Sequence, residues 1–289
     1  MRNPHEATAA LEIASRTPLE NLLPTFAKWS AWVAPDGDLE DAIDAMGEHL
    51  GETEGGYRFF QTLAILYWRL GDRELSIEYF HRCLRPASGL SAEIQQTEAE
   101  YATYDYDHIS IHRDTVAAFM EFAPEWLAQC SGGTLIDAAC GSGLAAPALK
   151  PYAGTLIGID ISSTMATRAQ ASGLYDQVIE ADMVTTLTAK PASADIIVCM
   201  GAAYYLADLA PFMTACATAL RPGGLLLFSD YSAPDHMGTG ITFGGTRRYC
   251  RSKAHLRALA AHAGLSEAGL GSGIAFASPS LYWAFRRTG

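Results

Sequence analysis

The chain has 289 residues, of which 49% are hydrophobic, and this length fits one large core with a smaller one beside it. The net charge of −12 is unevenly placed, because residues 1–130 hold 22 acidic and 9 basic side chains, whereas residues 131–289 hold 10 and 11. The acidic half would repel phosphates, and no stretch approaches the roughly 18 uninterrupted apolar residues of a membrane span, so we expect neither nucleic acid nor a membrane as partner.

Two similar helical segments follow each other near the start of the chain. Gly37-Asp38 and Gly71-Asp72 lie 34 residues apart, which is the period of tetratricopeptide repeats, and apolar residues recur at helical spacing around both turns. Residues 22–86 therefore resemble two tetratricopeptide units; a helical bundle without peptide binding is the alternative. Because fewer than three repeats rarely stand alone, we expect this segment to dock on the second domain or on another copy of the chain.

A predicted helical segment, in which Ser91 is a suitable N-cap, leads from these repeats to the second half. We expect an acidic helical domain over residues 1–95, a bridging segment over 96–130 and an α/β domain over 131–289. From Thr134 onward, short apolar runs alternate with helical segments, which predicts a parallel sheet covered on both faces. The strands are expected at 134–138, 155–161, 177–181, 194–200, 224–229, near 273–277 and at 281–286. Ser162 and Ser252 are suitable N-caps for helices that end at Gly173 and Gly264.

A glycine-rich turn follows the first of these strands and reads Asp137-Ala138-Ala139-Cys140-Gly141-Ser142-Gly143. Glycine lets the backbone come close to a ligand at the carboxyl ends of the strands, where open α/β sheets bind their ligands. Asp160 ends the second strand, 17 residues after Gly143, and its carboxylate can accept hydrogen bonds from both hydroxyls of a ribose. Asp182 ends the third strand, where it can receive an adenine amino group, and Ala138 and Ile161 supply apolar walls.

The same turn also fits the G-x-G-x-x-A pattern of dinucleotide-binding proteins, so an NAD(P)-dependent oxidoreductase is one alternative. Three features separate the two interpretations: Asp137 lies four residues before Gly141, Asp182 follows the third strand, and Leu220-Arg221-Pro222-Gly223-Gly224 precedes the fifth. With these features, residues 101–285 resemble the class I S-adenosylmethionine (SAM)-dependent methyltransferases. Within that superfamily the chain most resembles bacterial methyltransferases with N-terminal tetratricopeptide repeats.

The resemblance implies a Rossmann-like, seven-stranded methyltransferase sheet in residues 131–289, with SAM as cofactor, S-adenosylhomocysteine (SAH) as product and no metal ion. Carried over position by position, the cofactor-binding residues would be Tyr104, Asp137, Ala138, Ala139, Gly141, Gly143, Asp160, Ile161, Asp182, Met183, Met200 and Gly201. One residue departs from the family pattern, because Ala139 stands where the family usually has its first glycine. We expect a stiffer turn and weaker cofactor affinity from this alanine.

The acceptor side has no comparable motif. Methyl transfer can use a base on the acceptor, and the candidates are Tyr204, His108, His112 and His236. The connection after the fifth strand is rich in glycine and basic residues, so we expect Arg247 or Arg248 to pair with a carboxylate or phosphate, with Tyr205 and Tyr249 as further substrate-binding residues. The predicted acceptor is thus a small molecule, anionic or carrier-bound, that is methylated at O or N.

Six cysteines are scattered along the chain without a C-x-x-C pair, and the N-terminal residues contain no long apolar stretch. Both features predict a cytoplasmic protein with reduced thiols. We expect the tetratricopeptide-like domain to bind a protein partner or a second copy of the chain. A non-catalytic adaptor, in which the α/β half is a relic, is the remaining alternative.

Overall fold

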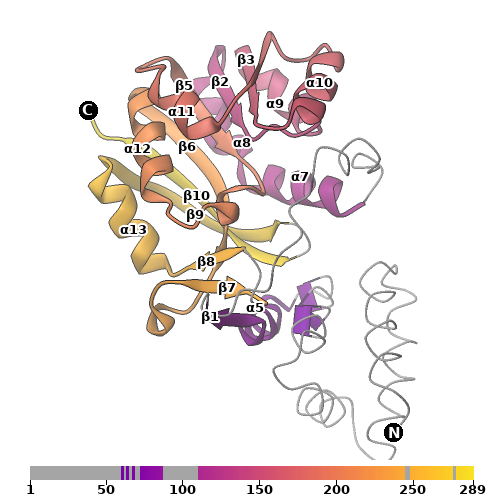
Figure 1. The fold of residues 1–289 in the computed structure, drawn as a ribbon, viewed down its shortest axis with the longest axis vertical. Helices are drawn as coiled ribbons and strands as arrows, with labels where there is room; N and C mark the ends of the chain where they lie inside the picture. The colour runs from indigo at the N-terminus through magenta and orange to yellow at the C-terminus, as the bar shows by residue number, and fades with distance from the viewer. Residues whose placement is uncertain are drawn as a thin grey trace, which may run out of the picture. The chain divides into compact units, whose positions relative to one another are not determined.

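The computed structural model describes residues 60–61, 63–64, 67–68, 72–86, 110–244, 248–275 and 278–289 (Figure 1). The chain divides into two compact units, one made of Met1–Leu90 with Ile241–Thr246 and the other of Ser91–Gly240 with Arg247–Gly289. Most of the tetratricopeptide-like segment and the expected cap Ser91 lie outside the described residues. The repeat, its docking and the domain bounds therefore stay predictions.

The described part of the first unit joins a helix to a small antiparallel ladder. Its elements are α5 (Arg73–Arg82), β1 (Leu84–Pro86) and β7 (Ile241–Phe243). Strand β1 pairs with β7, and Phe80 of the helix stacks on Phe243 with ring centroids 5.5 Å apart. Part of the connection after the fifth expected strand is thus a strand of the first unit, which local sequence does not reveal because its partner is 157 residues away.

The second unit alternates strands and helices. Its strands are β2 (Gly133–Ala138), β3 (Ala153–Asp160), β4 (Gln177–Glu180), β5 (Ala194–Cys199), β6 (Leu220–Ser232), β8 (Tyr249–Arg251), β9 (Leu265–Ala275) and β10 (Ser278–Arg287). Its α-helices are α7 (Ser110–Phe122), α8 (Pro124–Leu127), α9 (Ala146–Leu149), α10 (Ser163–Ala171), α11 (Met183–Thr188), α12 (Ala210–Ala219) and α13 (Lys253–His262). Short 3-10 turns are η1 (Ala128–Cys130), η2 (Lys150–Tyr152), η3 (Ala203–Tyr205) and η4 (Asp235–Met237).

The strands form a mixed sheet in which β2 is central. It pairs in parallel with β3 on one side and with β5 on the other, and β4 and β6 extend the two sides in parallel. Strand β10 runs antiparallel between β6 and β9, and the short β8 pairs with the end of β6. Because the chain turns to one side after β2 and to the other before β5, the carboxyl end of β2 is a topological switch point, where open sheets bind ligands.

Two apolar clusters cover the two faces of this sheet, which gives the unit three layers (Figure 1). One cluster includes Leu187, Phe212 and Leu256 from helices α11, α12 and α13. The other draws on helices α7 to α10, with Phe119 of α7 as its largest helical side chain. The glycine turn after β2 is therefore anchored to a sheet whose faces are both buried.

All seven expected strands are present, but the expected range of the sixth overlaps only the end of the observed strand. Strand β9 begins at Leu265, well before the expected Gly273. The sequence did not indicate this first part of the strand because the glycines within it weaken the strand pattern. These glycines are required by packing: a Cβ at Gly269 would lie 2.3 Å from Trp126 Cζ2. The strand itself is formed by antiparallel pairing with β10, which the local pattern does not reveal.

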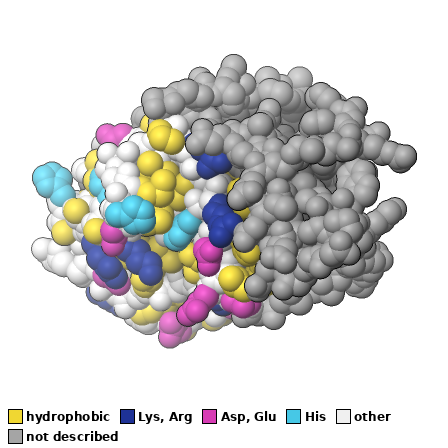
Figure 2. Space-filling model, turned by 90° about the horizontal axis from the view of Figure 1, so that it is seen from below, with side chains coloured by type: hydrophobic (Ala, Val, Ile, Leu, Met, Phe, Trp, Pro, Cys, Tyr) yellow, Lys and Arg dark blue, Asp and Glu magenta, His cyan; other side chains and the backbone are white. Residues whose placement is uncertain are grey.

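The helix caps follow from local sequence. Ser162 accepts a hydrogen bond from Met165 N at 3.2 Å and begins α10, and Ser252 accepts one from His255 N at 3.2 Å and begins α13. No helix among the described residues is long and apolar enough to cross a membrane. On the described part of the face in Figure 2, basic, acidic, histidine and hydrophobic side chains are interspersed.

Candidate functional site

A cavity of about 290 Å³ opens at the carboxyl ends of β2, β3, β4 and β5. A second cavity of about 60 Å³ adjoins it, and the two share His112, Ala139, Met200, Gly201 and Tyr204 in their walls. The structure therefore brings the residues that follow four different parallel strands to one place, as the sequence predicts.

The turn after β2 uses the left-handed region of backbone space. Ala139, Gly141 and Gly143 have φ angles of 62°, 55° and 87°. Glycine adopts this region freely, whereas a Cβ there costs roughly 1–2 kcal/mol, so Ala139 is strained. Ala139 and Gly141 line the larger cavity, but Gly143 lines neither, and a Cβ on it would lie 3.0 Å from Tyr175 Cε2. Gly143 is thus favoured both by its left-handed φ angle and by the close packing of Tyr175.

Asp160 at the end of β3 holds this turn in place. One carboxylate oxygen accepts a hydrogen bond from Gly141 N at 2.7 Å, and the other accepts one from Ser162 N at 2.9 Å. Each oxygen has a second lone pair, so the carboxylate can also accept hydrogen bonds from a ligand in the cavity that it lines.

Asp137 is 2% exposed and lines the smaller cavity. Burial raises its pKa to about 7, although the Tyr175 hydroxyl, which donates a hydrogen bond at 2.6 Å, lowers the pKa and the charge of Asp160 raises it further. A cationic group in the smaller cavity would favour the ionised carboxylate.

Beyond β3 and β4 the wall of the larger cavity is partly apolar. Asp182 caps α11, and its Oδ1 accepts hydrogen bonds from Thr185 N and Thr185 Oγ1, both at 2.8 Å. Met183 follows it in the wall. Ile161 and Tyr205 are the exposed large hydrophobic side chains of the described residues, at 73% and 50%, and both line this cavity. Apolar groups left exposed in a cavity mark contacts for a ligand.

The opposite end of the cavity is built from η3 and α7. Tyr204 is 1% exposed and stacks on Tyr231 of β6, with ring centroids 4.2 Å apart and planes 12° apart. Tyr205 lies against Tyr204 with centroids 4.7 Å apart, and His112 of α7, 6% exposed, lines both cavities. This end presents two phenol rings and one imidazole.

Several residues expected at the site lie elsewhere. Ala138 is fully buried in β2 and lines neither cavity, and His236 is exposed on η4 away from both. Arg248 and Tyr249 are half-buried and line neither cavity. The remaining three expected residues, Tyr104, His108 and Arg247, lie outside the described residues.

Met165, Ala202 and Leu206 line the larger cavity without having been expected, because apolar side chains carry no motif.

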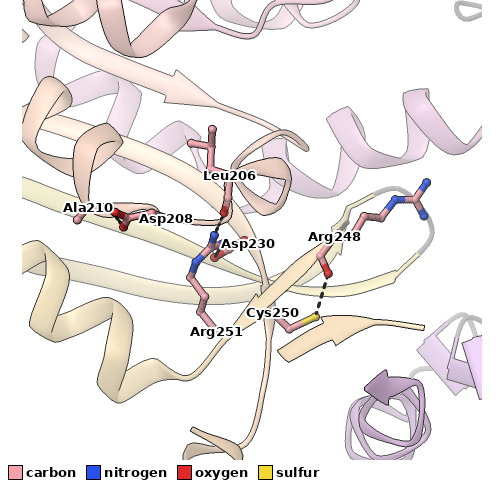
Figure 3. A network of polar contacts seen from close by, with 7 residues as sticks. All are labelled: Leu206, Asp208, Ala210, Asp230, Arg248, Cys250 and Arg251. Atoms are coloured by element: carbon pink, nitrogen blue, oxygen red, sulfur yellow. Dashed lines mark hydrogen bonds and ion pairs between the residues drawn. The ribbon is translucent and has the colours of Figure 1, made fainter. Parts of the chain in front are cut away.

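Two arginines of the basic stretch after β6, Arg248 and Arg251, point in different directions (Figure 3). Arg251 is 5% exposed and forms an ion pair at 2.9 Å with Asp230, which is fully buried, and it also donates a hydrogen bond to the Leu206 carbonyl. The Arg248 side chain points away from this pair, and its carbonyl accepts the Cys250 thiol at 3.8 Å. The pairing of Arg251 had no sequence signal, since Asp230 is 21 residues away.

Residues 136–228, which carry this turn and the ends of β2 to β5, match the model of the methyltransferase domain family. The chain contains a class I, SAM-dependent methyltransferase domain. The cavity at the switch point lies where the sequence predicts the ligand, whereas the association with tetratricopeptide repeats stays a prediction.

Curated relatives match this methyltransferase domain. The ubiquinone biosynthesis O-methyltransferase of Albidiferax ferrireducens is 30% identical over 115 residues, which are 36% of this chain and 45% of that protein. A Mycolicibacterium smegmatis protein named as an S-adenosylmethionine-dependent methyltransferase is 33% identical over 102 residues, 35% of this chain and 39% of that protein. The chain thus spans less than half the length of these relatives.

A solved structure shares the fold of the methyltransferase domain. It belongs to the complex between the Haloferax volcanii Trm112 methyltransferase activator and a methyltransferase. Its chain has a TM-score of 0.51 and 20% identity, and the match covers 68% of this chain and all of that one. At this identity the likeness establishes the arrangement of the elements alone.

Proposed function

We propose that the chain is a SAM-dependent methyltransferase that methylates a hydroxyl group of a small molecule. The observation that carries this proposal is the cavity at the ends of four parallel strands in a domain of the methyltransferase family, with Asp160 and Gly141 on one side and the tyrosines of η3 on the other. Oxygen is favoured over nitrogen as the acceptor atom because the relatives include enzymes named O-methyltransferases.

The residues present fit SAM. Asp160 would bind the ribose hydroxyls, Ile161 and Met183 would enclose the adenine next to Asp182, and Asp137 would face the methionine ammonium in the smaller cavity. Taken together, the adjoining cavities of about 290 and 60 Å³ lie near the lower end of the roughly 300–1,000 Å³ range of small-molecule sites. SAM, when bound, supplies a methyl group on a sulfonium.

The contribution of the chain to catalysis is mainly alignment. Holding donor and acceptor in line can lower a barrier by up to about 7–11 kcal/mol, and the end of β5 with η3 would form the surface against which the acceptor rests. Among the described candidate bases, His112 is the one we assign to accept the hydroxyl proton. His112 and Tyr204 both line the two cavities, whereas His236 lines neither, and Tyr204 is the less suitable of the two because its ring is packed against Tyr231.

An anionic or carrier-bound group on the acceptor would be held by Arg247 or Arg248. Since Arg248 lines neither cavity, such a group would have to extend past the cavity to reach it. Tyr104, His108 and Tyr249 keep their proposed roles as cofactor contact, base and substrate contact on sequence grounds alone.

Calorimetry and turnover together test the proposed function. We expect SAH to bind the full chain, and SAM to be converted to SAH when small phenols and catechols are supplied as acceptors. His112→Gln should keep SAH affinity and lose turnover. Stabilisation by NAD with no response to SAH would favour the oxidoreductase alternative, and SAH binding without turnover on hydroxyl or amine acceptors would favour the adaptor.

A further inference from the structure

Tyr204, Tyr205 and Leu206 form one wall of the cavity. The N-terminal part of this wall contacts strand β6 at two places. The Gly201 N–H donates a hydrogen bond at 2.9 Å to Oγ of Ser229, which is fully buried. Tyr204 then stacks on Tyr231, two residues further along the same strand. These contacts fix where the wall leaves β5, but neither of them holds Leu206 at its far end.

Arg251 supplies the contact at the far end. Nη1 of the guanidinium donates to both carboxylate oxygens of Asp230, at 3.1 and 2.9 Å, and Nη2 donates to the Leu206 carbonyl (Figure 3). The carboxylate aims the guanidinium, and the guanidinium holds the backbone of the wall. Leu206 and Arg251 are 45 residues apart, so the contact joins η3 to β8 through β6.

We propose that Arg251 is a positioning residue, which, oriented by Asp230, fixes the Tyr204–Leu206 wall of the cavity. The functional part of this inference rests on the proposed function, which makes that wall the acceptor end. We expect removal of the contact to leave the SAM end intact, because Asp160 and Asp182 follow β3 and β4, which lie on the other side of β2 from β6.

Stability alone does not explain the pair. Burying two charges costs several kcal/mol of desolvation for each ion, and well-packed apolar residues in their place are often neutral or stabilising. An apolar pair, however, would have no donor for the Leu206 carbonyl. A lysine would keep the charge, but its single nitrogen cannot occupy the positions of both guanidinium nitrogens. The arginine is thus suited to a pairing that must also hold a backbone carbonyl.

Hydrogen exchange of the full chain separates positioning from charge neutralisation. The variants are Arg251→Met, Arg251→Lys and, as a matched control, Arg257→Lys, which weakens an exposed fork between Arg257 and Glu267. Thermal melting, amide exchange of residues 202–208 and SAH affinity by calorimetry are measured for each. We expect Lys at position 251 to recover most of the melting temperature that Met loses, because it keeps Asp230 paired.

In the same lysine variant, the backbone amides of residues 202–208 should still exchange on the order of tenfold faster than in the wild type, because the hydrogen bond that resists local opening at Leu206 is lost. SAH affinity should stay within about twofold in that variant, and the Arg257→Lys control should change neither quantity. Unchanged exchange of residues 202–208 in folded Arg251→Lys protein, or loss of SAH binding in it, would overturn the positioning role. A wild type that fails to bind SAH would instead refute the proposed function, while the exchange result would still decide the role of Arg251.

Discussion

At the end of the cavity assigned to SAM, Asp160 accepts hydrogen bonds from Gly141 and from Ser162, which lies two residues further along the chain. At the opposite end, Leu206 is held by Arg251, which is itself held by Asp230. The first set of contacts joins neighbouring β-α connections and uses residue types that form a motif. The second joins three segments with no shared pattern. The contacts at the proposed SAM end can therefore be predicted from the sequence, whereas the shape of the proposed acceptor end depends on contacts that form only in the folded chain.

The largest expected effect lies at the acceptor end. Arg251→Met leaves a buried carboxylate without its partner and should cost about 3–5 kcal/mol in the free energy of unfolding, measured by urea denaturation. The double variant Asp230→Leu/Arg251→Met removes both charges and should recover most of that loss. If the double variant is as unstable as the single one, the loss does not come from an unpaired charge.

The next largest effect lies at the SAM end. Asp160→Ala removes a carboxylate that holds the Gly141 turn and would bind the ribose, so SAH affinity should fall by about 1.5–3 kcal/mol. Calorimetry checks this without knowledge of the acceptor, and Asp195→Ala is the control, because Asp195 pairs with Arg221 away from the cavity. Unchanged SAH affinity in Asp160→Ala would remove ribose binding from the role of this residue.

The pKa of Asp137 predicts how SAH affinity depends on pH. Its folded-state pKa of about 7 means that the carboxyl is neutral in acid and ionised in alkali, and the ionised form attracts the ammonium of SAH. Affinity should therefore fall as the pH drops below 7, by at most about tenfold per pH unit for one proton. Asp137→Asn should show a flatter pH profile. A profile that is the same in both proteins would assign the dependence to another group.

The free energy of unfolding should depend on pH in the opposite direction to SAH affinity. Because the folded-state pKa of Asp137 lies above its ordinary value of 3.8, the folded chain holds a proton that the unfolded chain has released. Stability contributed by this group is present in acid and is lost as the pH rises from about 4 to about 7. Urea denaturation of Asp137→Asn against the wild type across this range measures the contribution.

The smallest effect concerns the strained alanine. Ala139→Gly relieves roughly 1–2 kcal/mol of left-handed strain but adds roughly 0.5–1 kcal/mol of unfolded-chain entropy, so the net gain in stability should be small. SAH should also bind more tightly, since Ala139 lines both cavities. Ala192→Gly is the matched control, because Ala192 has a φ of 47° and lines neither cavity. Equal SAH affinity in Ala139→Gly and the wild type would show that the methyl group does not crowd the cofactor.

The sequence by itself determined the alternation of strands and helices, the caps at Ser162 and Ser252, and the gathering of Gly141, Asp160 and Asp182 at one edge of the sheet. These features depend on contacts within a few residues or on the direction of parallel strands, and both are written in local pattern. Asp160 and Gly141 could be expected at the cavity for this reason, whereas His236, expected on residue type alone, lies exposed outside it.

Only the tertiary structure decided that β7 completes the first unit, that Gly269 in β9 makes room for Trp126, and that Arg251 turns inward to Asp230 and Leu206. The partners in each case are far apart in the sequence, and none belongs to a spacing that secondary structure imposes. Arg251 shows the reason. A basic stretch in the sequence predicts a cationic surface, yet Arg251 lies in the core, paired with the buried carboxylate of Asp230, because a buried ion needs an oppositely charged partner.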